Sequence, residues 1–197
     1  MKYRYKFACV LAAVCALTRA PLCQETAPRP RWDFSAALAA ATGEENTNSF
    51  AEAQMASALV SVARTIARSP GSGWGSGSLE YQFSLAPLFV QFRPKNRHGI
   101  AFEPIGFRWN SNHTLGGMTP YIELGGGGVH TNLNIPPGNT SSFNFTAKGG
   151  GGVYLHRTAK HALDMGVRWS HLSNAYLGVD NPAFNGIEFR VAYHWFR

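Results

Sequence analysis

The sequence is poor in cysteine, and it lacks any apolar run long enough to cross a membrane as a helix. Three cysteines occur in 197 residues, and Cys9 and Cys15 both fall within the first 20. If that segment is removed, Cys23 alone remains, so the mature chain can form no intramolecular disulfide. Its stability must then come from a packed core or from a membrane.

The first residues have the composition of a secretory signal peptide. The basic start MKYRYK precedes the apolar run FACVLAAVCALT, and TRAPLC then brings small residues and a proline. This run is shorter than the roughly 20 residues that span a bilayer. We therefore expect a signal peptide over residues 1–20, cleaved near Ala20, and a short N-terminal segment over 21–30. Lipid attachment at Cys23 is the alternative. We rank it second because the residue before that cysteine, Leu22, is bulky.

Much of the positive charge lies in the segment that is expected to be removed. Loss of Lys2, Arg4, Lys6 and Arg19 lowers the formal net charge from +7 to +3. The high isoelectric point is therefore largely a feature of targeting, and we expect no nucleic-acid partner.

After residue 30, apolar and polar side chains alternate in segments of about ten residues separated by turn residues, as is typical of outer-membrane β-barrels. In the segment 161–173, for example, Leu163 and Val167 alternate with Asp164 and Arg168. The pattern predicts eight strands, at 31–41, 53–66, 78–93, 98–109, 118–131, 142–156, 161–173 and 185–196. The segment 53–66 fits an amphipathic helix nearly as well, so seven strands and one helix are the alternative.

Two features interrupt the alternation. Its phase shifts after Ala86-Pro87, which predicts a β-bulge at the proline. The motif GGGGV occurs in both 123–132 and 147–156, and β-prone residues follow it, whereas a phosphate-binding loop would need a helix there. We expect these glycines to allow tight coiling of neighbouring strands. Close approach of a ligand chain is the second interpretation. The stretch 132–142 is expected to be a loop.

The polar faces of the predicted strands favour a membrane barrel over a soluble one. They carry few charges in mid-strand and are rich in Asn, Thr, Ser and Gln, which suits the hydrogen-bonded interior of a small barrel. Trp and Tyr lie toward the strand ends, as at a bilayer interface. The expected fold class is all-β, an eight-stranded antiparallel transmembrane β-barrel over residues 31–197 in the outer membrane of a Gram-negative bacterium. A soluble exported lipid-binding barrel is the alternative.

The segment HLSNAYLGVDNPAFNGIE at 171–188 carries residues suited to ester chemistry. If both termini lie on the periplasmic side, the strand 161–173 runs outward and ends at the outer rim. Alternation then places His171 and Ser173 on the lipid face, close enough for the histidine to act as the base of the serine. A lone H-x-S in a strand is common, however, and carries little weight by itself. The other histidines lack the spacing of a metal site.

A histidine that acts as a base needs a third group to orient it and to stabilise its charged form. The candidates are Glu188, Asp180 and Asn185. Strict alternation turns Glu188 toward the lumen, so it reaches His171 only if the strand begins irregularly. An oxyanion hole could come from Asn174, or from the backbone N–H groups of Ala175 or Gly178.

The motif H-x-S-N-A, followed by a loop and G-I-E, resembles the PagL-type lipid A 3-O-deacylases, which are eight-stranded outer-membrane barrels with a Ser-His-Glu triad at the lipid-facing rim. The match is HLSNA at 171–175 and NPAFNGIE at 181–188, and weaker similarity covers roughly residues 30–197. The resemblance implies that Ser173 is the nucleophile, His171 the base, Glu188 the orienting acid and Asn174 an oxyanion-hole residue. The loop before Glu188 is longer here than in the usual pattern, which leaves Asn185 and Asp180 as alternatives.

The resemblance also implies a reaction: hydrolysis of the ester at the 3-position of lipid A, with release of a 3-hydroxy fatty acid. It implies no metal and no organic cofactor. The expected partners are lipopolysaccharide and outer-membrane lipid, and the sequence leaves open whether the barrel forms a homodimer. One alternative is a non-enzymatic barrel, an anchor or adhesin acting through the loops 42–52 and 132–142. The other is an esterase that acts on other membrane lipids.

Overall fold

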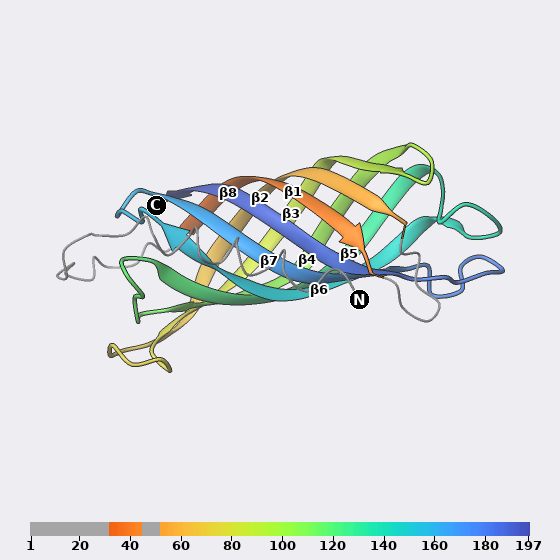
Figure 1. The fold of residues 1–197 in the computed structure, drawn as a ribbon. Coiled ribbons are helices and arrows are strands. Elements are labelled where there is room, and N and C mark those ends of the chain that lie inside the picture. The colour runs from red at the N-terminus through yellow and green to blue at the C-terminus, as the bar shows by residue number, and fades with distance from the viewer. Residues whose placement is uncertain (1–31, 45–51) are drawn as a thin grey trace, which may run out of the picture.

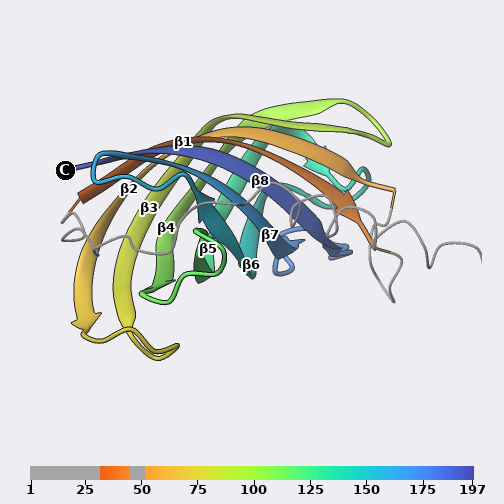
Figure 2. The ribbon, with the colours of Figure 1, turned by 60° about the vertical axis from the view of Figure 1, so that its left-hand side comes forward.

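The computed structural model describes residues 32–44 and 52–197, which form a closed antiparallel β-barrel (Figures 1 and 2). The strands are β1 (Trp32–Gly43), β2 (Gln54–Ser69), β3 (Gly77–Arg93), β4 (Arg97–Ser111), β5 (Thr119–Ile135), β6 (Ser141–Leu155), β7 (His161–Ser173) and β8 (Phe184–Phe196). Each strand pairs with its sequence neighbours, and β1 closes the barrel by pairing with β8. The predicted fold class is confirmed. The predicted signal peptide, the segment 21–30 and Cys23 lie outside the described residues.

The ambiguous segment 53–66 is a strand, so the alternative of seven strands and one helix is wrong. Within the described ranges there is no helix of the length and hydrophobicity needed to cross a membrane. The predicted bulge is confirmed, because Ala58 pairs with Leu88 whereas Val60 pairs with Leu85, which leaves one extra residue on β3 beside Pro87.

The predicted loop 132–142 is too long. Strand β5 extends to Ile135, which pairs with Ser141, and the connection to β6 is 136–140. Ile135, inside the predicted loop, is only 1% exposed. The Thr131 hydroxyl stabilises this irregular stretch through contacts with the carbonyl oxygens of Leu133 and Ser142.

The two faces of the barrel wall follow the alternation of the sequence. On β7, Leu163 and Trp169 are 36% and 45% exposed on the outside, whereas Asp164 and Arg168 are 0% and 4% exposed in the lumen. Large apolar side chains cover the outside of all eight strands, as a lipid-facing wall requires.

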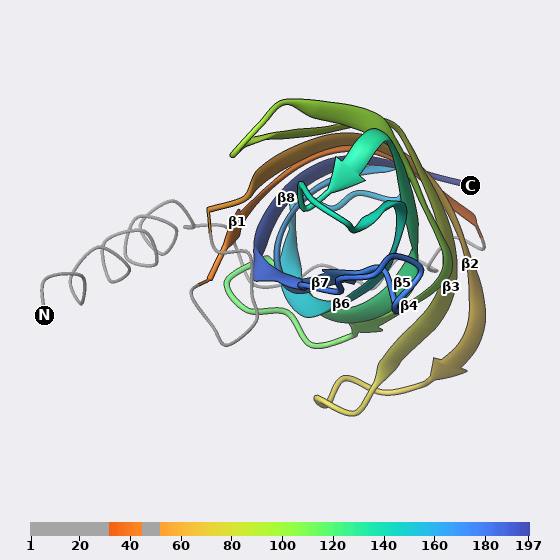
Figure 3. The ribbon, with the colours of Figure 1, turned by 90° about the vertical axis from the view of Figure 1, so that its right-hand side faces the viewer.

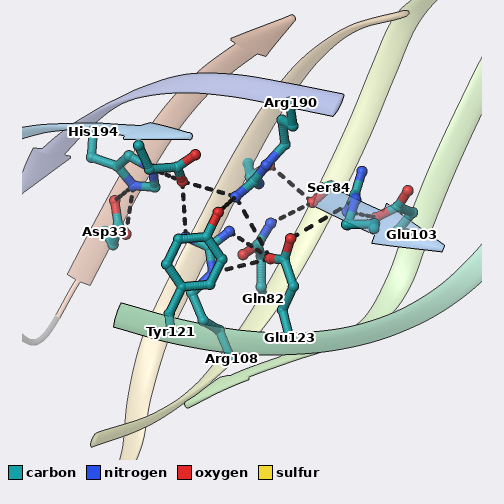
Figure 4. A network of polar contacts seen from close by, with 12 residues as sticks. Asp33, Gln82, Ser84, Glu103, Arg108, Tyr121, Glu123, Arg190 and His194 are labelled. Carbon is teal, nitrogen blue, oxygen red and sulfur yellow. Dashed lines mark hydrogen bonds and ion pairs between the residues drawn. The ribbon is translucent and has the colours of Figure 1, made fainter. Parts of the chain in front are cut away.

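Ion pairs and hydrogen bonds fill much of the lumen (Figure 4). Arg108 contacts both Glu123 and Asp164, and the His194 ring lies between Asp164 and Asp33. A separate apolar cluster also lies inside, which the sequence did not predict. Its buried members are Ala53, Met55, Phe89, Val129, Ile135, Leu172 and Phe184.

The glycine repeats lie where strands approach too closely for a side chain. A Cβ atom on Gly127 would lie 1.9 Å from the carbonyl oxygen of Phe102, and one on Gly150 would lie 2.1 Å from that of Val167. This agrees with the expectation of tight strand coiling.

The start of β1 meets the C-terminal residue at one end of the barrel, where the backbones of Trp32 and Arg197 exchange hydrogen bonds of 2.8 and 2.9 Å. The other end carries the connections 94–96, 136–140 and 174–183 (Figure 1). Viewed along the barrel, the strands form a ring, and 136–140 and 174–183 lie side by side at this mouth (Figure 3). We call it the site end, because β7 finishes there.

Candidate active site

Strand β7 brings the predicted serine and histidine together on the outer face. Its last residues alternate so that Leu172 and Asn174 are buried, whereas His171 and Ser173 are half-buried on the lipid side. The distance from His171 Nε2 to Ser173 Oγ is 3.0 Å, which is hydrogen-bonding distance. Behind this pair, Leu172 packs in the apolar cluster with Phe184, and this packing anchors the end of the strand.

Asn185 completes a continuous hydrogen-bonded series. It is the β8 residue paired with His171, and its Oδ1 atom lies 2.8 Å from His171 Nδ1. An amide oxygen only accepts hydrogen bonds, so Nδ1 carries the hydrogen and donates it. In the neutral ring Nε2 then has the free lone pair, which is the tautomer that can accept the proton of Ser173.

Glu188 does not lie beside His171. The β7–β8 ladder runs without a register shift, and Glu188 pairs with Arg168 on the lumen side. Its carboxylate contacts the Arg168 guanidinium and, at 2.9 Å, the Lys148 ammonium. The expectation that Glu188 orients His171 is therefore corrected, because no bulge reorients the start of β8. Asn185, one of the two alternatives, occupies that position.

Asp180, the other alternative, contributes its backbone and not its carboxylate. Its N–H donates to the carbonyl oxygen of Asn139 at 3.0 Å, and its own carbonyl oxygen accepts from Asn174. Within the described part of the chain, the hydrogen bonds of the His171 ring go to Asn185 and Ser173.

The proposed oxyanion-hole residues have different surroundings. Asn174 is fully buried, and its side chain holds the loop: Nδ2 donates to Asp180 at 2.8 Å and Oδ1 accepts from the Tyr176 N–H at 2.8 Å. The structure therefore does not turn this amide toward Ser173. Gly178 packs against Thr140, where a Cβ atom would lie 2.7 Å from that residue's backbone.

Ala175 follows the pair directly and has an unusual backbone. Its φ is 51°, and that of Tyr176 is 63°. Such left-handed conformations are uncommon outside glycine and cost roughly 1 kcal/mol or more each. They occur here in the turn that directly follows Ser173.

Trp169, which lies outside the motif, also contacts the pair. Its ring stacks on that of His171, with centroids 5.8 Å apart and an angle of 17° between the planes. The period-two alternation had placed both on the lipid face. No group of three or more His, Cys, Asp or Glu suited to a metal ion occurs in 32–44 or 52–197.

Comparison with known proteins identifies the family. The model of the family described as lipid A 3-O-deacylase (PagL) matches residues 46–194, which is more than half of the chain. The chain belongs to the lipid A 3-O-deacylase (PagL) family. A search of curated proteins finds no match.

Solved structures agree with this PagL-family fold. The crystal structure of the outer membrane enzyme PagL aligns with a TM-score of 0.54 and 20% identity, covering 81% of this chain and 97% of that one. Neisserial surface protein A also aligns with a TM-score of 0.54, at 11% identity, covering 87% and 100% of the two chains. At such identities the structures show the fold alone, whereas family membership makes this outer-membrane barrel a hydrolase.

Proposed function

We propose that this PagL-family barrel removes the 3-position acyl chain of lipid A, with Ser173 as nucleophile, His171 as general base and Asn185 as the residue that orients His171. The observation that carries the proposal is the hydrogen-bonded series from Asn185 through His171 to Ser173 on the lipid face. The three side chains come from adjacent strands of one chain, so the site needs no second subunit.

The reaction has two steps. Ser173 Oγ attacks the ester carbonyl carbon while His171 Nε2 takes its proton, and the bond to the sugar oxygen breaks as His171 returns that proton to the leaving alkoxide. The acyl chain is then held as an ester of Ser173. Water then attacks this ester while His171 takes its proton, and His171 returns the proton to Ser173 Oγ as the 3-hydroxy fatty acid is released. The Ala175 N–H is the proposed donor to the oxyanion.

The location of the pair fits a lipid ester as substrate. His171 and Ser173 lie at the site end of a wall that is otherwise apolar, where a polar pair is stable only if it meets polar groups. The ester region of an outer-leaflet lipid provides such groups at that depth. We therefore propose that the site end faces the outer leaflet and that lipopolysaccharide is the partner.

Mass spectrometry of lipid A after incubation with the refolded mature protein tests the proposal. The wild type should remove the mass of one 3-hydroxyacyl chain, and Ser173→Ala and His171→Ala should each lower the rate by at least about 10³-fold. Ser170→Ala is the matched control, because Ser170 lies on the same strand but faces the lumen, 5% exposed. Unchanged lipid A with a folded wild type would refute the proposal, and release of fatty acid from phospholipid alone would favour a different esterase.

A further inference from the structure

We propose that Trp169 is a positioning residue for the base: its indole stacks on His171 and stabilises the imidazolium that forms when the ring takes the Ser173 proton. This rests on the roles proposed above for His171 and Ser173. It adds a residue outside the H-x-S-N-A motif to the site.

The contact is directed along the strand. Trp169 and His171 are two residues apart on β7 and share its outer face, where their rings lie 5.8 Å apart and nearly parallel. Across the strands, Trp169 pairs with Gly149. A Cβ atom on Gly149 would have only the Glu123 carbonyl oxygen, at 3.9 Å, within 4 Å. The indole therefore does not lie over its β6 neighbour but over the imidazole.

The charges around His171 explain why this contact matters. Its paired residues on β6 and β8 are Ala147 and Asn185, and neither carries a charge. On the lumen face of the same strands, Lys148, Arg168 and Glu188 form ion pairs with one another and with Glu103. In the loop that follows Ser173, Asp180 is exposed, and its backbone is hydrogen-bonded to Asn139 and Asn174. No carboxylate contacts the imidazole among the described residues.

An aromatic face can take over part of the role that a triad carboxylate performs. A cation within about 6 Å of a ring centroid is attracted by the ring quadrupole, most strongly for tryptophan and more strongly when water is excluded. The ring separation of 5.8 Å lies within that range. Asn185 thus fixes the tautomer, and Trp169 stabilises the charge.

Kinetics of Trp169→Leu and Trp169→Phe, measured against pH, test the role. Trp169→Leu keeps an apolar lipid-facing side chain, and it should lower kcat/KM about tenfold. The acid limb of the kcat/KM profile should move to lower pH, because the charged ring has lost its stabilising partner. Trp169→Phe should recover part of both effects. Trp195→Leu is the control, since Trp195 is also lipid-facing, 41% exposed, but lies at the opposite end of β8.

A fluorescence titration tests the contact without relying on turnover. A protonated imidazole quenches an indole stacked on it. The titration uses a Trp74→Phe background as its wild type, because the Trp74 ring lies 4.4 Å from that of His113 and would respond to pH as well. In this background the emission of the remaining tryptophans should show a pH-dependent step. This step should be absent from both His171→Ala and Trp169→Phe and present in Ser173→Ala. If the emission step is missing from the wild type, or if Trp169→Leu keeps the wild-type pH profile in an active enzyme, the proposal is overturned. Inactivity of the wild type with the step present would instead count against the proposed function.

Discussion

At the scale of the residue, the proposed site differs from a serine hydrolase triad in one side chain, the amide of Asn185. Its oxygen accepts from His171 Nδ1 at 2.8 Å, so it can hold the ring in the reactive tautomer. It carries no charge, however, and it stabilises the imidazolium less than a carboxylate does. Cys-His-Asn enzymes use the same substitution with a more acidic nucleophile.

Asn185→Asp should therefore raise kcat, because a carboxylate of the same length would accept the same hydrogen bond and add a negative charge. We expect a gain of about tenfold. The opposite change in a serine hydrolase, from a triad aspartate to asparagine, lowers kcat by about 10⁴-fold because His then adopts the wrong tautomer. In this protein the His171 tautomer is already correct, so the expected gain is much smaller. The measurement is kcat on lipid A, followed by mass spectrometry.

Asn185→Ala and Asn96→Asp are the matched variants for this test. The first removes the acceptor and should lower kcat by about tenfold or more. The second introduces the same acid on the exposed connection 94–96 and should leave kcat unchanged. An equal gain in both aspartate variants would mean that surface charge, not orientation of His171, causes the effect.

The sequence predicted His171 and Ser173 as a pair, because two residues two apart on a strand always share a face. It also gave Asn185 as an alternative to Glu188, and the alternation that turns Glu188 into the lumen turns Asn185 outward with Phe189. The motif favoured Glu188 instead. Only the cross-strand register, which pairs His171 with Asn185, decides between them, and register cannot be read from one strand.

At the scale of the element, the loop 174–183 is held by one buried side chain. Asn174 makes hydrogen bonds through its side chain with Asp180 and Tyr176, and through its backbone with Asn181 and Leu177. These contacts maintain the left-handed turn after Ser173. We infer that they preorganise the Ala175 N–H.

Asn174→Ala should loosen this loop and lower activity together. Loss of two side-chain hydrogen bonds in a buried position should cost about 2 kcal/mol of local stability. Limited proteolysis should then cut within 174–183 in the variant but not in the wild type, and kcat should fall about tenfold or more while KM changes little. Asn139→Ala is the control, because Asn139 contacts the loop through its backbone oxygen. A slow variant whose loop still resists proteolysis would instead assign the Asn174 amide directly to the oxyanion.

The central residues of the strands were predictable from the sequence, whereas the residues at which strands end were not. Alternation identified all eight strands, including β2, because each wall residue faces either lipid or lumen. The end of β5 was missed, since polar residues such as Asn132 also occur in strands whose pairing becomes irregular near a connection. The apolar cluster around Ile135 was missed because its members come from different strands, which only the closed barrel brings together.

At the scale of the whole molecule, the barrel wall separates the proposed catalytic residues from the charged residues of the lumen. Ester chemistry is proposed for the outside, and the lumen holds charges that stabilise the fold. Glu188 lies on the inner side, 5% exposed, between Arg168 and Lys148. These cations also contact Glu103, so Glu188 belongs to a network that joins β4, β6, β7 and β8.

Glu188→Gln should accordingly weaken the fold and spare the chemistry. Removing one partner of a buried ion pair costs about 3 kcal/mol, because it leaves uncompensated charge behind. We expect a lower free energy of unfolding, measured by urea denaturation in lipid vesicles, with kcat of the folded protein within about twofold of the wild type. Glu52→Gln at the same end is the control, because Glu52 is exposed and its loss should change neither quantity. If Glu188→Gln kept full stability but lost turnover, Glu188 would act in the reaction after all, and the register of β7 and β8 would have to change when substrate binds.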